Sequence, residues 1–90
     1  MIHREIVVKG KVQGVYFRAT ACSVGIRLGL NGTVKNLPDG SVRIVAEGSS
    51  HALEEFISWC RTGPIGATVT ELDITEGPLE DMNGFEILHG

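Results

Sequence analysis

The segment GKVQGVYFR, from Gly10 to Arg18, contains residue types that bind oxyanions. Gly10 and Gly14 free the backbone to curl, so that consecutive N–H groups can point into one concavity. The segment joins a predicted strand to a predicted helix, whose first N–H groups and positive dipole end attract anions. Arg18 adds a planar guanidinium that suits phosphate oxygens. The pattern predicts an anion-binding loop, and the alternative is an ordinary loop-to-helix junction with a solvated arginine.

Arg18 has an unfavourable electrostatic position for a helix residue. A cation in the first turn opposes the helix dipole, typically by about 0.3–1 kcal/mol. A bound anion would turn that repulsion into attraction. The segment matches neither G-x-x-x-x-G-K-[ST] nor G-x-G-x-x-G, so it does not indicate a nucleotide P-loop or a dinucleotide site.

Asn36 ends a predicted strand just before the turn Leu37-Pro38-Asp39-Gly40. Its side chain could bond the local backbone, as asparagine commonly does beside a turn. Its amide can also donate and accept at once, which would let it position a water molecule. The sequence leaves both roles open.

The other candidate nucleophiles and metal ligands have weaker support. Cys22 and Cys60 form no CxxC motif, and the histidines are scattered singly, so no zinc site is expected. We also predict that the protein uses no cofactor. Cys60 lies on an apolar helical stripe and should be a core residue, whereas Cys22 should lie off the core face. We predict two free thiols, with a Cys22–Cys60 disulfide as the alternative.

The length of 90 residues suits one small domain, and we predict a single domain over residues 1–90. Its 42% hydrophobic and 21% charged residues are typical of a globular protein rather than a disordered one. No apolar run approaches the roughly 20 residues that span a bilayer. No secretory signal pattern is present. We therefore expect a cytoplasmic protein with no membrane partner. We also predict a monomer, although composition does not determine the oligomeric state.

The net charge of −3 conceals an asymmetry along the chain. Residues 1–44 carry seven cationic and two acidic side chains, whereas residues 45–90 carry one cationic and nine acidic side chains. This distribution favours a local anion site in the first half, unless the two halves interleave and the asymmetry averages out. The acidic balance argues against a nucleic-acid partner, which would need a strongly basic face.

Hydrophobic periodicity predicts the elements that position these residues. Helical spacing marks residues 17–28 and the segment between Gly48-Ser49-Ser50 and Gly63-Pro64, where a serine is the expected N-cap. Gly29 and Gly32 are interpreted as the end of the first helix and the loop beyond it. Strand patterns mark residues 2–9, 33–36, 41–47, 67–74 and 85–88. The order β-α-β-β-α-β with a short extra C-terminal strand predicts an α+β, ferredoxin-like α/β sandwich, an antiparallel sheet with two helices on one face.

These residues resemble the acylphosphatase family. The segment GKVQGVYFR looks like that family's phosphate-binding signature, and the region around Val34-Lys35-Asn36 resembles its second signature. The resemblance extends from about Val7 to Ile87. Thr33 departs from the pattern, since tryptophan or tyrosine is common there, and His89 and Gly90 extend past the final strand. Further residues that fit the pattern are Leu28-Gly29-Leu30, Gly32, Asp39-Gly40-Ser41-Val42, Glu47-Gly48, Phe56, Trp59, Gly63-Pro64, Ala67, Val69 and Phe85.

The resemblance implies a hydrolase that converts small-molecule acyl phosphates to a carboxylate and inorganic phosphate without a metal. It implies Arg18 and Asn36 as catalytic residues: Arg18 would bind the phosphoryl group and Asn36 would orient the attacking water. Because the loop would grip the phosphoryl end, we expect loose selectivity for the acyl group. Backbone N–H groups would cradle the phosphate oxygens, and these belong to Gln13, Gly14, Val15, Tyr16, Phe17 and Arg18.

A non-catalytic phosphate-binding or regulatory module of the same fold is the main alternative, because one fold serves many functions. Pure binding gives no reason for a water-positioning amide, so Asn36 favours the enzyme. A third interpretation is a structural domain that associates through its edge strands.

Overall fold

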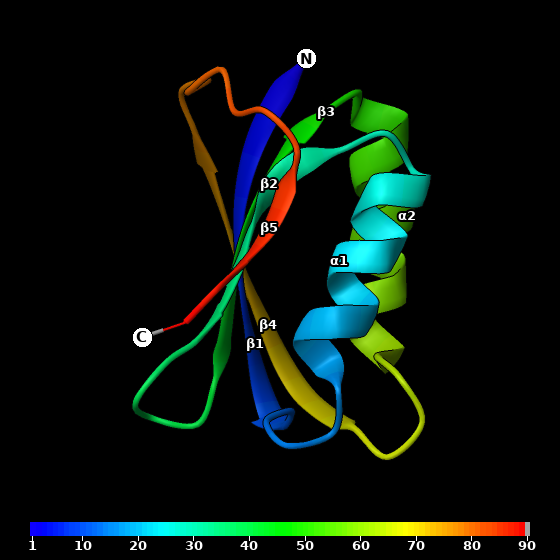
Figure 1. The fold of residues 1–90 in the computed structure, drawn as a ribbon, viewed down its shortest axis with the longest axis vertical. Coiled ribbons are helices and arrows are strands. Elements are labelled where there is room, and N and C mark those ends of the chain that lie inside the picture. The colour runs from blue at the N-terminus through cyan, green and yellow to red at the C-terminus, as the bar shows by residue number, and fades with distance from the viewer. Residues whose placement is uncertain (90) are drawn as a thin grey trace.

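The computed structural model describes residues 1–89 and has the predicted ferredoxin-like fold. A five-stranded sheet forms one layer, and both helices lie on one of its faces (Figure 1). The elements are, in chain order, β1 (Ile2–Lys11), α1 (Phe17–Arg27), β2 (Asn31–Asn36), β3 (Val42–Gly48), α2 (Ser50–Thr62), β4 (Thr68–Gly77) and β5 (Phe85–Leu88).

The strands lie in the order β4-β1-β3-β2-β5. The first four strands are antiparallel as expected, because β1 pairs with β3 and β4, and β2 pairs with β3. The extra strand β5 instead runs parallel to β2, with Lys35 opposite Leu88. A parallel neighbour ends at the same end of the sheet, so the residues that follow β2 and β5 lie close together.

Gly32 was predicted to lie in the loop after the first helix, and this prediction is wrong. It lies inside β2, is buried, and pairs with Ala46 of β3. A Cβ at this position would lie 2.0 Å from the backbone oxygen of Val45, so only glycine allows the two strands to pair here. A glycine within a strand often marks such a close approach.

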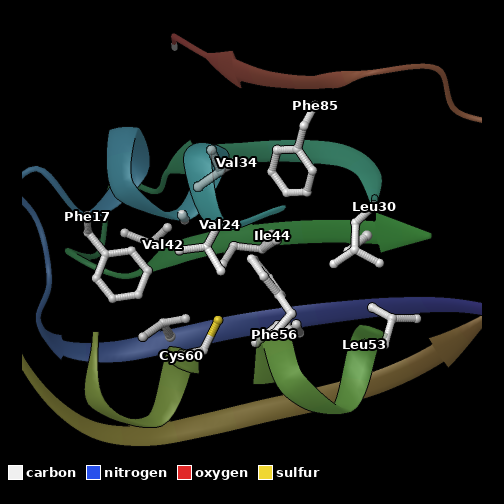
Figure 2. Close-up of a cluster of buried hydrophobic side chains, with 14 of the residues drawn as sticks. Phe17, Val24, Leu30, Val34, Val42, Ile44, Leu53, Phe56, Cys60 and Phe85 are labelled. Carbon is white, nitrogen blue, oxygen red and sulfur yellow. The ribbon is translucent and has the colours of Figure 1, made fainter. Parts of the chain in front are cut away.

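The core fills the space between the sheet and the helices (Figure 2). On α2, Leu53, Phe56 and Cys60 are buried as their spacing predicts. Ser49 is the expected N-cap, because its side chain accepts a hydrogen bond from Ala52 N at 3.1 Å. Burial of this stripe is what holds α2 against the sheet.

Helix α1 packs against β5 as well as against β2. Gly25 is buried, and a Cβ there would lie 2.6 Å from the ring of Phe85. This glycine, which weakens the helix by itself, makes room for the ring. Cys22 was expected off the core face, but it is half-buried against the core and its Sγ donates to Phe85 O at 3.3 Å. Both contacts hold β5 against α1.

Candidate active site

A pocket of about 390 Å³ lies where the loop after β1, the first turn of α1 and the ends of β2 and β5 meet. It brings Arg18 and Asn36 together, although they lie in different elements. The described residues that line the pocket include no carboxylate, so its main charge is the Arg18 guanidinium. The lining residues are Val12, Gly14, Tyr16, Phe17, Arg18, Ala19, Asn36, Ile87 and His89.

The loop from residue 12 to residue 16 curls because its backbone adopts conformations that extended chain does not reach. Gly14 has a φ of 76°, and Tyr16, the residue before α1, has a φ of 61°. Tyr16 provides no side-chain cap, and the first turn of α1 contains no acidic residue. The first N–H groups of a helix have no partner within it, so this turn presents free donors and a positive dipole end.

Phe17 anchors this loop in the core. Its side chain is 1% exposed, and its ring centroid lies 5.3 Å from that of Trp59 on α2. Figure 2 shows the ring pointing inward among the core side chains. Gly63 ends α2 directly against it, since a Cβ there would lie 2.8 Å from Phe17 Cε2. The packing of Phe17 therefore fixes the direction of the helix start and of its neighbour Arg18.

Arg18 is half-buried, and its guanidinium reaches to the end of β5. Its Nη1 donates to Leu88 O at 3.4 Å and lies 3.5 Å from His89 Nδ1. These long contacts orient the side chain without neutralising its charge. The cation therefore remains available to an anion in the pocket, which supports the prediction of an anion site over that of a solvated arginine.

Asn36 is the last residue of β2, and its Oδ1 is buried with no hydrogen-bond partner within residues 1–89. The local turn bond that the sequence allowed for Asn36 is made by Asp39 instead, whose Oδ1 accepts from Ser41 N at 2.9 Å. A buried carbonyl oxygen without a partner is costly, so such groups usually serve a ligand or an ordered water. The amide of Asn36 is therefore suited to hold a water in the pocket.

The side chain of Gln13 makes a contact in the candidate site that the sequence pattern did not reveal. Its Nε2 donates to Leu37 O and to Ser41 O, both at 2.8 Å. These bonds tie the curled loop to the turn that follows Asn36. Gly14, Tyr16, Phe17 and Arg18 line the pocket, whereas the side chain of Gln13 bonds the turn and that of Val15 packs against the core.

The buried acid of this chain lies at the other end of the sheet. Glu47 accepts hydrogen bonds from the backbone of Met82 at 3.0 Å, from that of Glu80 at 2.6 Å, and from His3 Nδ1 at 2.7 Å. The two backbone donors, with His3, lower the pKa of Glu47 from 4.5 to about 2. Asn31 is opposite Glu47, while Asn36 at the far end of β2 is opposite Val42, so this cluster is remote from the pocket.

The structure also bears on metal ligands, membrane-spanning helices and the two cysteines. No group of three or more potential metal-ligating side chains occurs in the part of the chain that the structure describes. Among residues 1–89, no helix has the length and apolar character needed to cross a membrane. Cys22 and Cys60 are both free thiols, so the disulfide alternative is not supported.

Together, the fold and the pocket define a ferredoxin-like α/β sandwich with a curled loop and an arginine at the start of its first helix. A family model for the acylphosphatases matches residues 4–87. An acylphosphatase of Aeropyrum pernix is 47% identical over 89 residues, which cover 97% of this chain and 88% of that relative. An acylphosphatase of Methylococcus capsulatus is 49% identical over 71 residues, or 79% of this chain and 77% of the relative. The crystal structure of an acylphosphatase from Bacillus subtilis superimposes with a TM-score of 0.95 at 38% identity, covering 98% of this chain and 99% of that one.

The chain therefore belongs to the acylphosphatase family. Its activity is that of an acylphosphatase, the hydrolysis of an acyl phosphate to a carboxylate and inorganic phosphate. The family match decides in favour of the hydrolase over the non-catalytic module that the sequence left as the main alternative.

Proposed function

We propose that Arg18, the backbone N–H groups of residues 13–18 and Asn36 carry out this hydrolysis. The observation that carries the proposal is the pocket itself, which holds a cation, a helix N-terminus and an unpartnered amide oxygen within one volume of about 390 Å³. Each supplies a different requirement of phosphoryl transfer, namely charge, orientation and a positioned nucleophile.

The chemistry needs little acid–base assistance. Water attacks phosphorus, a new P–O bond forms, and the bond to the carboxyl oxygen breaks with its electron pair leaving on the carboxylate. An acyl phosphate dianion and one water yield a carboxylate and a dihydrogen phosphate monoanion, so both water protons end on the phosphate. A carboxylate is a good leaving group because carboxylic acids have a pKa of about 4.

Arg18 and the loop backbone stabilise the charge on the phosphoryl oxygens. Phosphoryl transfer passes through a loose transition state whose charge is spread over these oxygens. Donors that are already oriented stabilise that charge without reorganising. The contact of Arg18 with Leu88 O and the anchoring of Phe17 supply this orientation here.

Asn36 positions the water. Its Oδ1 can accept a hydrogen bond from the attacking molecule, which fixes the direction of a lone pair toward phosphorus. An amide is neutral, so it does not repel the incoming dianion as a carboxylate base would.

The division of roles is tested by Arg18→Ala and Asn36→Ala, with Arg27→Ala and Asn83→Ala as controls at exposed positions. Loss of one preorganised donor typically lowers kcat by about 10²–10³. We expect Arg18→Ala to lose both turnover of benzoyl phosphate and binding of inorganic phosphate, and Asn36→Ala to lose kcat while phosphate still binds. Phosphate affinity is measured by NMR titration. Normal turnover in Arg18→Ala would refute the assignment, and lost phosphate binding in Asn36→Ala would refute the split.

We further propose that the reaction requires no metal. Arg18 and the start of α1 supply positive charge to the pocket. In other phosphoryl-transfer sites a metal ion supplies that charge. Turnover in excess chelator should equal turnover without it. Activity that is lost in chelator and restored by a divalent cation would overturn this proposal.

We also propose that residues 1–90 form a single domain and that the protein is a cytoplasmic monomer. The single domain is supported by the one sheet and by the one core, which includes residues of both helices. Light scattering after size-exclusion chromatography tests the monomeric state, since a monomer has a mass of 9.7 kDa.

A further inference from the structure

Tyr16 lines the pocket in a backbone conformation that its side chain disfavours. Its φ of 61° and ψ of 25° lie in the left-handed region, which bulky residues rarely adopt. Within residues 1–89, the other residues in positive-φ conformations are glycines, apart from Asp81. A glycine would form this turn with less strain, so the turn does not explain the aromatic side chain.

Packing does not explain it either. Tyr16 is 84% exposed, whereas its neighbour Phe17 is buried in the core. The backbone of Tyr16 is held firmly, because its carbonyl oxygen accepts from Thr20 N at 3.1 Å and from Thr20 Oγ1 at 2.9 Å. The side chain is therefore anchored at the pocket wall with most of its surface free for a ligand. Strained residues of this kind cluster in binding sites.

The pocket is larger than a phosphoryl group requires. Its volume of about 390 Å³ falls within the range of roughly 300–1,000 Å³ that encloses whole small molecules. Arg18, Asn36 and the loop backbone account for the phosphoryl group and the water. The remaining lining includes Tyr16, Ala19 and Ile87, which carry no charge. Part of the acyl group therefore fits inside.

The in-line direction of the reaction separates the acyl group from the attacking water. Lys35 lies opposite Leu88 in the parallel register, so Asn36 and His89 leave β2 and β5 side by side. In-line attack puts the water and the leaving carboxylate on opposite sides of phosphorus. With the water at Asn36, the acyl group lies on the far side of phosphorus, and Tyr16 is the exposed aromatic side chain of the pocket lining that can contact it.

We propose that the ring of Tyr16 is a specificity-determining contact for the acyl group, which makes the site favour acyl phosphates with a flat apolar acyl group over those with a small one. The ring offers an apolar face on which such a group can stack. This inference rests on the proposed function of Arg18 and Asn36. The preference is moderate, in keeping with the loose acyl selectivity expected of a site that grips the phosphoryl end.

The test compares benzoyl phosphate with acetyl phosphate, after subtraction of spontaneous hydrolysis. The ratio of kcat/KM for the two substrates reports on the acyl group alone, because any change in the grip on the phosphoryl group affects both. Tyr16→Ala keeps a Cβ at this strained position and removes the ring. We expect it to lower the benzoyl-to-acetyl ratio about tenfold, the size of one stacking contact. Tyr16→Phe, which keeps the ring, should retain the ratio.

Ile26→Ala is the matched control, because Ile26 is 60% exposed on α1 and does not line the pocket. It should leave the ratio unchanged. A ratio that is the same in Tyr16→Ala and the wild type would overturn the inference, as would a wild type that prefers acetyl phosphate. Arg18→Ala separates this failure from that of the proposed function. If Arg18→Ala hydrolyses both substrates normally, the assigned site is wrong. If Arg18→Ala loses both activities while Tyr16→Ala keeps the benzoyl-to-acetyl ratio of the wild type, only the acyl contact is wrong.

Discussion

Gln13 connects the curled loop to the turn behind Asn36, and Gln13→Glu tests that connection. The Nε2 of Gln13 donates to Leu37 O and Ser41 O, both at 2.8 Å. Glutamate has nearly the same shape, but an ionised carboxylate has no hydrogen to donate and would face two carbonyl oxygens. We expect the substitution to lower both the stability of the fold and the rate of turnover.

The magnitude follows from the two bonds. A hydrogen bond contributes about 0.5–1.5 kcal/mol net, so losing both lowers the free energy of unfolding by about 1–3 kcal/mol. In a domain of 60–100 residues each kcal/mol shifts Tm by about 4–8 °C, so we expect Tm to fall by about 4–24 °C. Asn36 directly precedes Leu37, and a displacement near 1 Å can cost about 10²-fold in rate, so kcat should fall roughly 10–100-fold.

The assay combines thermal unfolding by circular dichroism with steady-state hydrolysis of benzoyl phosphate, measured well below the Tm of each variant. Asn31→Ala is the control, because Asn31 Oδ1 accepts a similar bond from Gly84 N at 2.9 Å at the other end of β2. The control should lower Tm and leave kcat unchanged. If Gln13→Glu retains the kcat of the wild type, the loop and Asn36 do not depend on this link and the reasoning is refuted.

Three further outcomes follow from the structure. The pKa of Glu47 is lowered from 4.5 to about 2, so the stability that its ionised form provides is complete above about pH 4.5 and is lost as the pH falls toward 2. Urea midpoints measured across that interval should therefore fall less in Glu47→Gln than in the wild type, and equal slopes would contradict this role. Gly10→Ala should destabilise the fold by roughly 2–6 kcal/mol, because a Cβ there would lie 2.1 Å from Thr68 O at a φ of 127°, and strain and overpacking each cost about 1–3 kcal/mol; an unchanged denaturation midpoint would show that the backbone at Gly10 relaxes to admit the side chain. Burial raises the pKa of the Cys60 thiol to about 12, so a thiol reagent at pH 8 should modify Cys60 only after unfolding, whereas half-buried Cys22 should react faster in the native protein; mass spectrometry of the labelled peptides decides.

The order of elements was predictable because local patterns determine it. The apolar stripe of α2 and the Ser49 cap depend on residues a few positions apart, and both are confirmed. The family resemblance was equally visible, because the segment from Gly10 to Arg18 is contiguous. Periodicity missed Gly32 within β2, since its reason is a contact with Val45 on another strand.

For the candidate site, the sequence indicated which residues to consider but not how they are arranged. The sequence indicated Arg18 through its place at a helix start, and Asn36 through its place before a turn. It did not reveal that Gln13 binds the turn behind Asn36, because that contact spans 24 and 28 positions. The sequence also left open whether Asn36 makes a turn bond or binds water. In the structure Asp39 makes the turn bond, and Asn36 Oδ1 has no partner within residues 1–89.

The sequence by itself determined the local conformations: which segments become helices and strands, where the chain curls, and where a cation meets a helix start. These depend on short-range sterics, side-chain periodicity and backbone freedom at glycine. Only the tertiary structure decided that β5 runs parallel to β2 and brings Leu88 and His89 to Arg18, and that Asn36 keeps an unpartnered oxygen in the same pocket. The physical reason is that strand pairing and core packing join residues far apart in sequence, and a local pattern carries no information about which of them will meet.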